Sequence, residues 1–174
     1  MSGRRSIASV GAVIIVLLLA IVMGLNLSPT GDSAMNAVMF DISPGRGIGS
    51  INFGATADEI EAVFGPADIV HPQAQSRLYR NEGLVFYMDR QGRLARFEAV
   101  SARTNLSIDE DFPGTIRGRI RIGSLDSEVI DFLGQPTEAE HENGSIANGT
   151  WDDLGLTLYF DEEQQLGAIS AEAR

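Results

Sequence analysis

Two residue types are missing from this chain of 174 residues: cysteine and lysine. Without cysteine there is no disulfide bond, no thiolate metal ligand and no lipid-modified cysteine, so the stability of the fold rests on packing. All 13 basic residues are arginine, against 24 acidic residues, and the formal net charge is −11. An acidic surface repels phosphate backbones, so we expect no nucleic-acid partner.

Charge is also absent from residues 6–31. An almost wholly apolar run begins there at Ala8 and ends at Leu27. At ~1.5 Å of rise per residue this run spans the ~30 Å hydrocarbon core of a bilayer. Arg4 and Arg5 precede it, and the positive-inside bias then keeps the N-terminus cytoplasmic. The sequence predicts a single-pass anchor in the cell membrane, with the C-terminal part of the chain extracytoplasmic.

A cleaved signal peptide is the alternative for the same segment. Its apolar core is usually only ~7–15 residues long and ends at an A-x-A-like site. The nearest candidate sites end at Ala34 and Ala37, and each has an unsuitable residue two positions earlier, Asp32 or Met35. The anchor is the preferred interpretation, and both interpretations place the product outside the cytoplasm.

The rest of the chain contains an internal repeat. Residues 51–65 (INFGATADEIEAVFG) match residues 120–134 (IRIGSLDSEVIDFLG) after an offset of 69, and residues 83–99 match residues 155–171 after an offset of 72. Each repeat has only about 55 residues, a size at which an isolated core is marginal, so the two should pack together or share one sheet. We divide the chain into an N-terminal stub with the anchor (residues 1–30), a tether (31–46), a first repeat (47–101), a linker (102–117) and a second repeat (118–174).

Each repeat should begin with a short amphipathic helix. Thr56 and Glu59 form a capping-box signature, an apolar face follows at helical spacing, and Gly65 ends the helix. In the second copy Leu125 replaces Thr56, so Ser124 or Asp126 is expected to supply the cap. The residues of the two apolar faces are Ile60, Val63 and Phe64 in the first copy and Val129, Phe132 and Leu133 in the second.

Strands should follow each helix. Residues 84–88 alternate with period two, a turn follows, and residues 94–99 return; residues 156–160 and 166–171 repeat this pattern. A shorter strand is expected around Tyr79 and around Trp151, and another before each helix, at residues 48–53 and 119–122. Each unit then reads β-α-β-β-β, a helix on an antiparallel sheet, and the predicted class is α+β. The linker, with its acidic run, should be a solvated crossing.

The segments around each helix carry a family resemblance. The pattern GATADEI…FGP at residues 54–66, and its copy ending in LGQP at residues 133–136, resembles the repeats of the β-lactamase inhibitory protein family. It is also similar to the small lipoprotein subunit of the outer-membrane β-barrel assembly machine. The resemblance implies an exported, non-enzymatic helix-on-sheet module used for protein–protein contact. Departures include the missing cysteines and the strands expected here where both families have a helix.

The sheet face away from the helices is the candidate binding surface. Alternation places Val85, Tyr87, Arg96 and Glu98 on it, and Thr157, Tyr159 and Ser170 in the second copy. Aromatic residues with a polar tip are favoured at protein interfaces. The predicted partner-binding residues are Tyr87, Tyr159 and Arg96, with Tyr79 and Trp151 at the edge of the surface. The alternative is that these rings pack in the core or between the two halves.

The two histidines, His71 and His141, fall in register between the repeats, each five residues after a proline and three after an acid. They could bind one metal ion if the halves bring their loops together; otherwise both are exposed loop residues. Paired acids such as Asp58 and Glu61 lie on an expected solvated helix face, without a nucleophile or phosphate loop. No catalytic residue and no cofactor are predicted.

The leading hypothesis is therefore a membrane-anchored, non-enzymatic module that binds a protein or another cell-envelope component. A metal- or small-ligand-binding envelope sensor is the alternative. A cleaved, secreted inhibitor-like protein is the second alternative.

Overall fold

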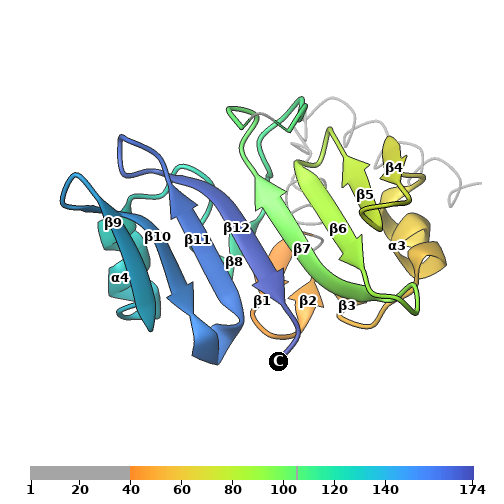
Figure 1. The fold of residues 1–174 in the computed structure, drawn as a ribbon, viewed down its shortest axis with the longest axis horizontal. Helices are drawn as coiled ribbons and strands as arrows, with labels where there is room; N and C mark the ends of the chain where they lie inside the picture. The colour runs from red at the N-terminus through yellow and green to blue at the C-terminus, as the bar shows by residue number, and fades with distance from the viewer. Residues whose placement is uncertain (1–39, 105) are drawn as a thin grey trace, which may run out of the picture. The chain divides into compact units, whose positions relative to one another are not determined.

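A computed structural model describes residues 40–104 and 106–174 of the chain (Figure 1). The fold is α+β, as the sequence predicts, with helices α3 (Ala57–Phe64) and α4 (Asp126–Leu133), a 3-10 turn η1 (Asp152–Leu154) and two sheets. The larger sheet contains β4 (Ile69–His71), β5 (Ser76–Tyr79), β6 (Leu84–Met88), β7 (Leu94–Val100), β9 (Glu138–Glu142), β10 (Ser145–Trp151), β11 (Leu156–Phe160) and β12 (Leu166–Glu172). The smaller sheet contains β1 (Asp41–Ser43), β2 (Gly47–Ile48), β3 (Ile51–Asn52) and β8 (Thr115–Ile116).

The larger sheet is antiparallel throughout and continuous, in the order β4-β5-β6-β7-β12-β11-β10-β9. Its centre is the pair β7 and β12, in which Arg96 lies opposite Glu172, Glu98 opposite Ser170 and Val100 opposite Ala168. Residues of β7 and their equivalents on β12 are 72 positions apart, so Arg96 is equivalent to Ala168 and Val100 to Glu172. Replacing each residue by its equivalent converts the Arg96–Glu172 pair into the Ala168–Val100 pair, and the register is therefore symmetric about the Glu98–Ser170 pair. The two halves therefore share one sheet.

Both helices lie on the same face of this sheet, together with the smaller sheet (Figure 1). Their apolar faces bury Ile60 and Val129, which are both fully inaccessible to solvent. The strands beneath contribute Phe86 and Leu158, equally buried and in equivalent positions. Alternation along a strand turns every second side chain to this side. One apolar core thus runs under both helices.

The backbone around the two helices is nearly identical. Before α3, the Gly54 N–H donates to the Leu94 carbonyl at 2.8 Å, and before α4 the Gly123 N–H donates to the Leu166 carbonyl at 2.8 Å. Gly65 and Gly134 end the helices at φ 79° and 84°, a left-handed region that glycine enters without steric cost. Local sequence therefore sets where each helix begins and ends.

The N-terminal caps are the main difference between the helices. At α3 the Thr56 hydroxyl accepts from the Glu59 N–H at 3.4 Å, and the Glu59 carboxylate accepts from the Thr56 N–H at 2.7 Å. The second bond lowers the pKa of Glu59. At α4 only this second bond survives, from the Leu125 N–H to Glu128 at 3.1 Å, because a leucine side chain accepts no hydrogen bond. The expected replacements do not restore it: the Ser124 hydroxyl accepts from Arg121 outside the helix, and Asp126 accepts only from the adjacent Ser127 N–H.

The segments outside the repeats are more ordered than the sequence indicates. Residues 41–43, expected within the polar tether, form β1, which pairs with β2 and, in parallel, with β8 from the expected linker. Ile42 and Ile116 on these strands are fully buried. The expected strand 48–53 is a tight β2–β3 hairpin, and within the expected strand 119–122 only Ile120 forms a bridge, to Ile116. Tether and linker residues thus close the core that neither repeat closes alone.

The predicted membrane anchor, residues 8–27, lies outside the residues that the structure describes. Within the described ranges, neither helix has the length and apolar character needed to cross a bilayer.

The unequal caps predict unequal effects of single substitutions. Thr56→Ala should lower the free energy of unfolding by about 1 kcal/mol, and Leu125→Ser should raise it by about 0.5–1 kcal/mol by supplying the missing acceptor. Urea unfolding followed by circular dichroism measures both changes. Leu106→Ser is the control, because Leu106 is as exposed as Leu125 (43% against 44%) but caps no helix. Equal effects of the two Leu→Ser changes would show that the cap is not the cause.

Candidate binding surface

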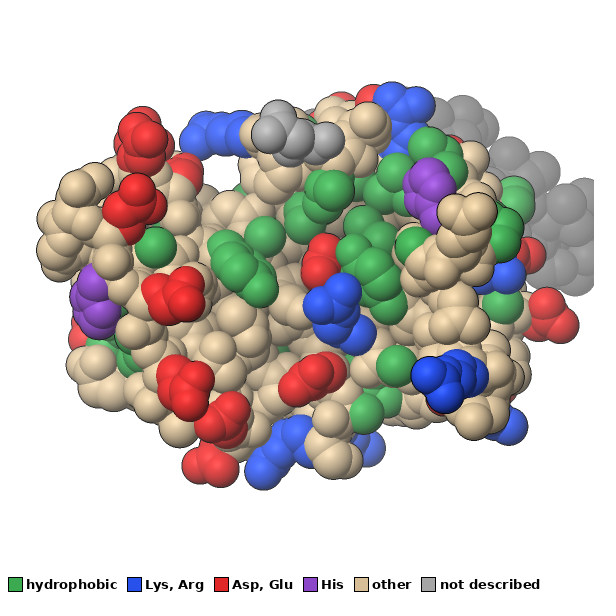
Figure 2. Space-filling model, in the orientation of Figure 1, with side chains coloured by type: hydrophobic (Ala, Val, Ile, Leu, Met, Phe, Trp, Pro, Cys, Tyr) green, Lys and Arg blue, Asp and Glu red, His purple; other side chains and the backbone are tan. Residues whose placement is uncertain are grey.

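The face of the larger sheet opposite the helices is the side shown in Figure 2. The strand registers place on it Leu78, Val85, Tyr87, Arg96, Glu98 and Val100 in the first half, and Thr150, Thr157, Tyr159, Ala168, Ser170 and Glu172 in the second. We call this the open face. Tyr87, Arg96 and Tyr159, three of the predicted binding residues, lie on it.

In the first half, Tyr87 is held by two charged neighbours. Its hydroxyl donates to the Glu98 carboxylate at 3.0 Å, and the Arg96 guanidinium carbon lies 4.2 Å from the centre of its ring. Arg96 also pairs with Glu98 at 3.3 Å. Burial, followed by the Glu98 charge, raises the pKa of Tyr87. The ring face and the hydroxyl of Tyr87 are therefore both contacted by side chains of strand β7, Arg96 and Glu98.

The segment between the halves covers part of the same side. Ile108 is buried against Leu78, Val85 and Val100, which form a small apolar cluster on the open face. Arg80 holds this segment in place, because it donates to the Ser107 carbonyl at 2.9 Å and pairs with Asp109 at 2.8 Å. The expected solvated crossing is therefore, in part, a cover for the open face of the first half.

In the second half, the described residues make no such hydrogen bond or cation contact with the corresponding tyrosine, Tyr159. Tyr159 is 44% exposed and lies between Asn148 on β10 and Ala168 on β12. Beyond Asn148 lies Glu140 on the edge strand β9, whose carboxylate accepts from the Asn148 amide at 2.6 Å. Acidic side chains gather over this half of the face in Figure 2. The second half thus presents an exposed aromatic ring in acidic surroundings.

Two predicted binding residues are core residues instead. Tyr79 is 1% and Trp151 4% exposed, and both point to the helix side of the sheet. The Tyr79 ring packs edge-on against Phe86 with centroids 5.5 Å apart, and the Trp151 indole N–H donates to the Gly134 carbonyl at 2.9 Å, at the end of α4. The prediction that they lie at the edge of the binding surface is wrong, because their strands turn these positions inward.

The histidines do not meet. His71 lies on β4 and His141 on β9, the two outermost strands of the larger sheet, not on loops. Seven strand spacings separate these strands, roughly 30 Å, so one chain cannot place both rings on one metal ion. Within residues 40–104 and 106–174, no cluster of three or more His, Asp or Glu side chains is arranged to hold a metal. The metal hypothesis based on this pair is therefore wrong.

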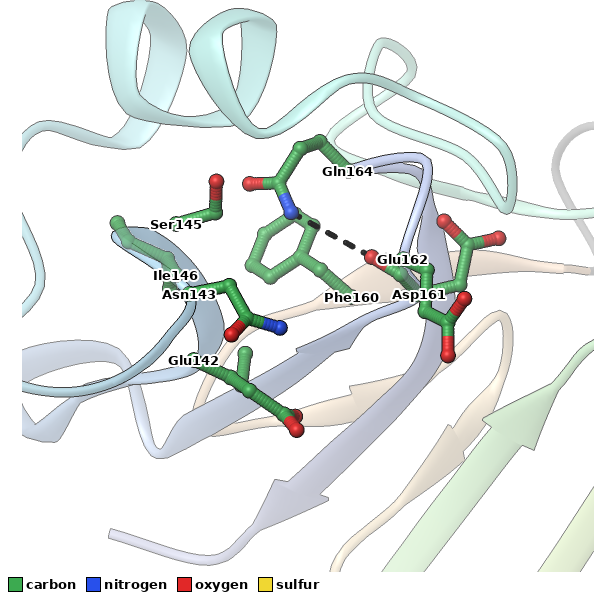
Figure 3. Close-up of a pocket in the computed structure, with 9 residues that line it drawn as sticks. Glu142, Asn143, Ser145, Ile146, Phe160, Asp161, Glu162 and Gln164 are labelled. Atoms are coloured by element: carbon green, nitrogen blue, oxygen red, sulfur yellow. Dashed lines mark hydrogen bonds between the residues drawn. The ribbon is translucent and has the colours of Figure 1, made fainter.

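A pocket of about 430 Å³ lies between the β9–β10 hairpin and the β11–β12 turn (Figure 3). Phe160 forms part of its lining, together with Glu142, Asp161 and Glu162. The Gln164 amide nitrogen donates to the Asp161 carbonyl at 3.5 Å, while its buried side-chain oxygen has no partner within the described chain. Three carboxylates at its wall extend the acidic character of the second half.

These observations define an exposed sheet face as the candidate site. Its second half is acidic and carries the exposed Tyr159, whereas in its first half Tyr87 is contacted by Arg96 and Glu98 of the same chain. No model of a known protein family matches the chain. No curated protein matches it either. Its structure is similar to the crystal structure of a DUF4309 family protein, YjgB, from Bacillus subtilis, with a TM-score of 0.51 and 12% sequence identity over 75% of this chain and 88% of that one. At this identity the likeness concerns the fold alone. The resemblance to the inhibitor family stays a prediction.

The sequence did not predict the edge strands β4 and β9 or the cover formed by Ile108. The β9 sequence, EAEHE, has no apolar alternation, and all five residues are exposed. It is a strand because it pairs with β10, and no signal in its own residues could have found it. Ile108 directly precedes the acidic run at residues 109–111 and belongs to no periodic pattern, so its contacts on the sheet are visible only in the tertiary structure.

Tyr79 leads to a prediction about alkaline stability. Its hydroxyl is buried and has no hydrogen-bond partner among the residues that the structure describes. Burial, aided by the Glu61 charge, raises its pKa to about 12. Below the unfolded-state pKa of about 10 both states are protonated. Between about pH 10 and 12 only the unfolded state ionises, so the free energy of unfolding should fall as the pH rises.

Tyr79→Phe should reduce this fall by on the order of 2 kcal/mol and leave stability at pH 7 unchanged or slightly higher. Urea unfolding at a series of pH values up to 11.5 measures it. Tyr159→Phe is the matched control, since its ring is exposed, and should follow the parent protein. A pH profile of the Tyr79→Phe protein that overlays the parent profile would contradict the assignment.

Proposed function

We propose that this protein is a membrane-anchored, extracytoplasmic binding module without enzymatic activity, and that it contacts a protein or another envelope component through the open face. The proposal includes a tandem duplication, in which each copy contributes a helix and four strands of one sheet. The pairing of β7 with β12, which is symmetric about the Glu98–Ser170 pair, supports the duplication.

The observation that carries the proposal is the two-sidedness of the larger sheet. One face is buried by α3, α4 and the smaller sheet, whereas the other presents Tyr159 beside small and polar side chains on four adjacent strands. Antiparallel sheets often leave one face to solvent, but such a face is usually polar. An exposed aromatic residue with a polar tip on such a face is typical of protein contact surfaces.

Site-specific photocrosslinking in native membranes tests the surface. A benzophenone amino acid at Thr157, on the open face, should give a discrete adduct, and the same group at Asp131, exposed on α4, should not. Tyr159→Ser in the Thr157-labelled protein should reduce the adduct at least about fivefold, as expected for the loss of a central aromatic contact. Thermal unfolding of each variant confirms that the fold is retained.

Equal adduct yields from Thr157 and Asp131 would contradict the proposed surface. So would an adduct from Thr157 that is insensitive to the serine substitution in a protein that remains folded.

Membrane attachment needs its own test, which also separates the anchor from the secreted alternative. If residues 8–27 remain as an anchor, the full-length chain should stay in the membrane fraction after alkaline carbonate extraction, and its N-terminus should be intact by mass spectrometry. A chain shortened beyond Ala34 or Ala37 and released into the soluble fraction would establish cleavage.

A further inference from the structure

In the first half of the open face, the tyrosine at the position equivalent to Tyr159 binds an arginine of the same chain. Tyr87 lies directly opposite Arg96 in the β6–β7 register, and the guanidinium covers its ring at 4.2 Å. The Glu98 carboxylate, two residues further along β7, binds both the Arg96 guanidinium and the Tyr87 hydroxyl. Cations are attracted to the face of an aromatic ring, and a guanidinium stacks on it well.

The second half repeats the backbone but lacks the cation. At the offset of 72, Tyr87 corresponds to Tyr159 and Arg96 to Ala168, and the β11–β12 register places Tyr159 directly opposite Ala168. The methyl group of Ala168 leaves the ring face uncovered, and Tyr159 is 44% exposed. Between Arg121 and Arg174 the sequence contains no arginine or lysine, so the strands β9 to β12 of the second half supply no cation to this face.

Carboxylates on β9 and β12 share the open face with the uncovered ring. Glu140 reaches Asn148, the cross-strand neighbour of Tyr159, and Glu138 lies on the same side of β9. Glu172, four residues beyond Ala168 on β12, lies on the open face opposite Arg96 of the first half. The nearby cation from the linker, Arg103, is 3.9 Å from Asp161 at the end of β11. The charge at this surface is therefore complementary to a basic ligand.

We propose, building on the proposed function, that the open face of the second half binds an arginine-bearing segment of a partner polypeptide. One arginine lies over the Tyr159 ring, in the place that Arg96 occupies over Tyr87, and neighbouring basic residues pair with Glu140 and Glu138. The Thr150 and Thr157 side chains lie along the same strip, where their hydroxyls are 3.3 Å apart and form one hydrogen bond with each other. A second copy of this chain is a poor occupant, since each copy carries a net charge of −11.

The first experiment measures binding of a defined probe to the full-length chain in a neutral detergent. The probe is a fluorescent peptide, Gly-Ser-Arg-Thr-Arg-Thr-Arg-Ser-Gly, and its control has citrulline, a neutral isostere, in place of each arginine. Anisotropy should show binding that weakens with salt and falls at least about tenfold for the citrulline peptide. Tyr159→Ala should cause a similar loss, whereas Tyr159→Phe, which keeps the ring, should stay within about twofold. Equal binding of the two peptides, or full binding by the alanine variant, would overturn the proposal.

The second experiment uses the first half as a template. Ala168→Arg places a guanidinium opposite Tyr159 in the register that Arg96 has with Tyr87, so it should occupy the ring from within the chain. Binding of the arginine peptide should fall at least about tenfold. Ala168→Gln, a long but neutral side chain, is the matched control and should retain binding within about threefold. Circular dichroism confirms folding, and equal losses in the two variants would mean that bulk at Ala168 is responsible, which would overturn the proposal.

The same variant separates this inference from the proposed function. If Ala168→Arg abolishes peptide binding but leaves the Thr157 adduct with the native partner intact, the partner is not a basic segment, and only the inference fails. If the parent protein gives no Thr157 adduct, the proposed function fails while the peptide measurement stands by itself. An adduct between two copies of this chain that depends on Tyr159 would also overturn the inference.

Discussion

The pairing of β7 with β12 is the interaction on which the rest of the structure depends. Each half contributes four short strands and one two-turn helix, which is too little to bury a stable core alone. Joining the last strand of each half makes one sheet of eight strands, removes two exposed edges and places both helices on the same face. The apolar core then extends under α3 and α4 without a break. Because the register is set at the Glu98–Ser170 pair, both tyrosines of the open face are also oriented by this contact.

The segments outside the repeats complete the fold in different ways on the two faces. On the covered face, β1, β2, β3 and β8 close the space between the helices, with Ile42, Ile48 and Ile116 in the core. On the other face, Ile108 covers an apolar cluster of the first half only. The edge strands β4 and β9 are short or strongly charged, which discourages pairing with other sheets. Tether and linker thus decide how much of each face remains accessible.

The two halves share a backbone but differ in chemistry. The first half has aromatic packing between Phe64, Tyr79 and Phe86, and its open-face tyrosine is bound by Arg96 and Glu98. The second half has Leu158 in place of Phe86, Ala168 in place of Arg96 and Ser170 in place of Glu98, with twelve acids against three arginines in residues 118–174. The shared backbone permits this divergence, because helix packing fixes the backbone whereas open-face side chains contribute little to its stability. The asymmetry therefore concentrates on the surface that we propose binds a partner.

The sequence by itself determined the repeat, the two helices with their stops at Gly65 and Gly134, the α+β class and the period-two strands that turn Tyr87 and Tyr159 away from the core. These features arise from local spacing and backbone preferences, which a sequence displays directly. Only the tertiary structure decided that β7 and β12 join the halves, that EAEHE is a strand, that Tyr79 and Trp151 are buried, that Ile108 covers one half, and that the histidines lie at opposite edges. These depend on contacts between residues far apart in the chain, and such contacts leave no periodic signal in either partner alone.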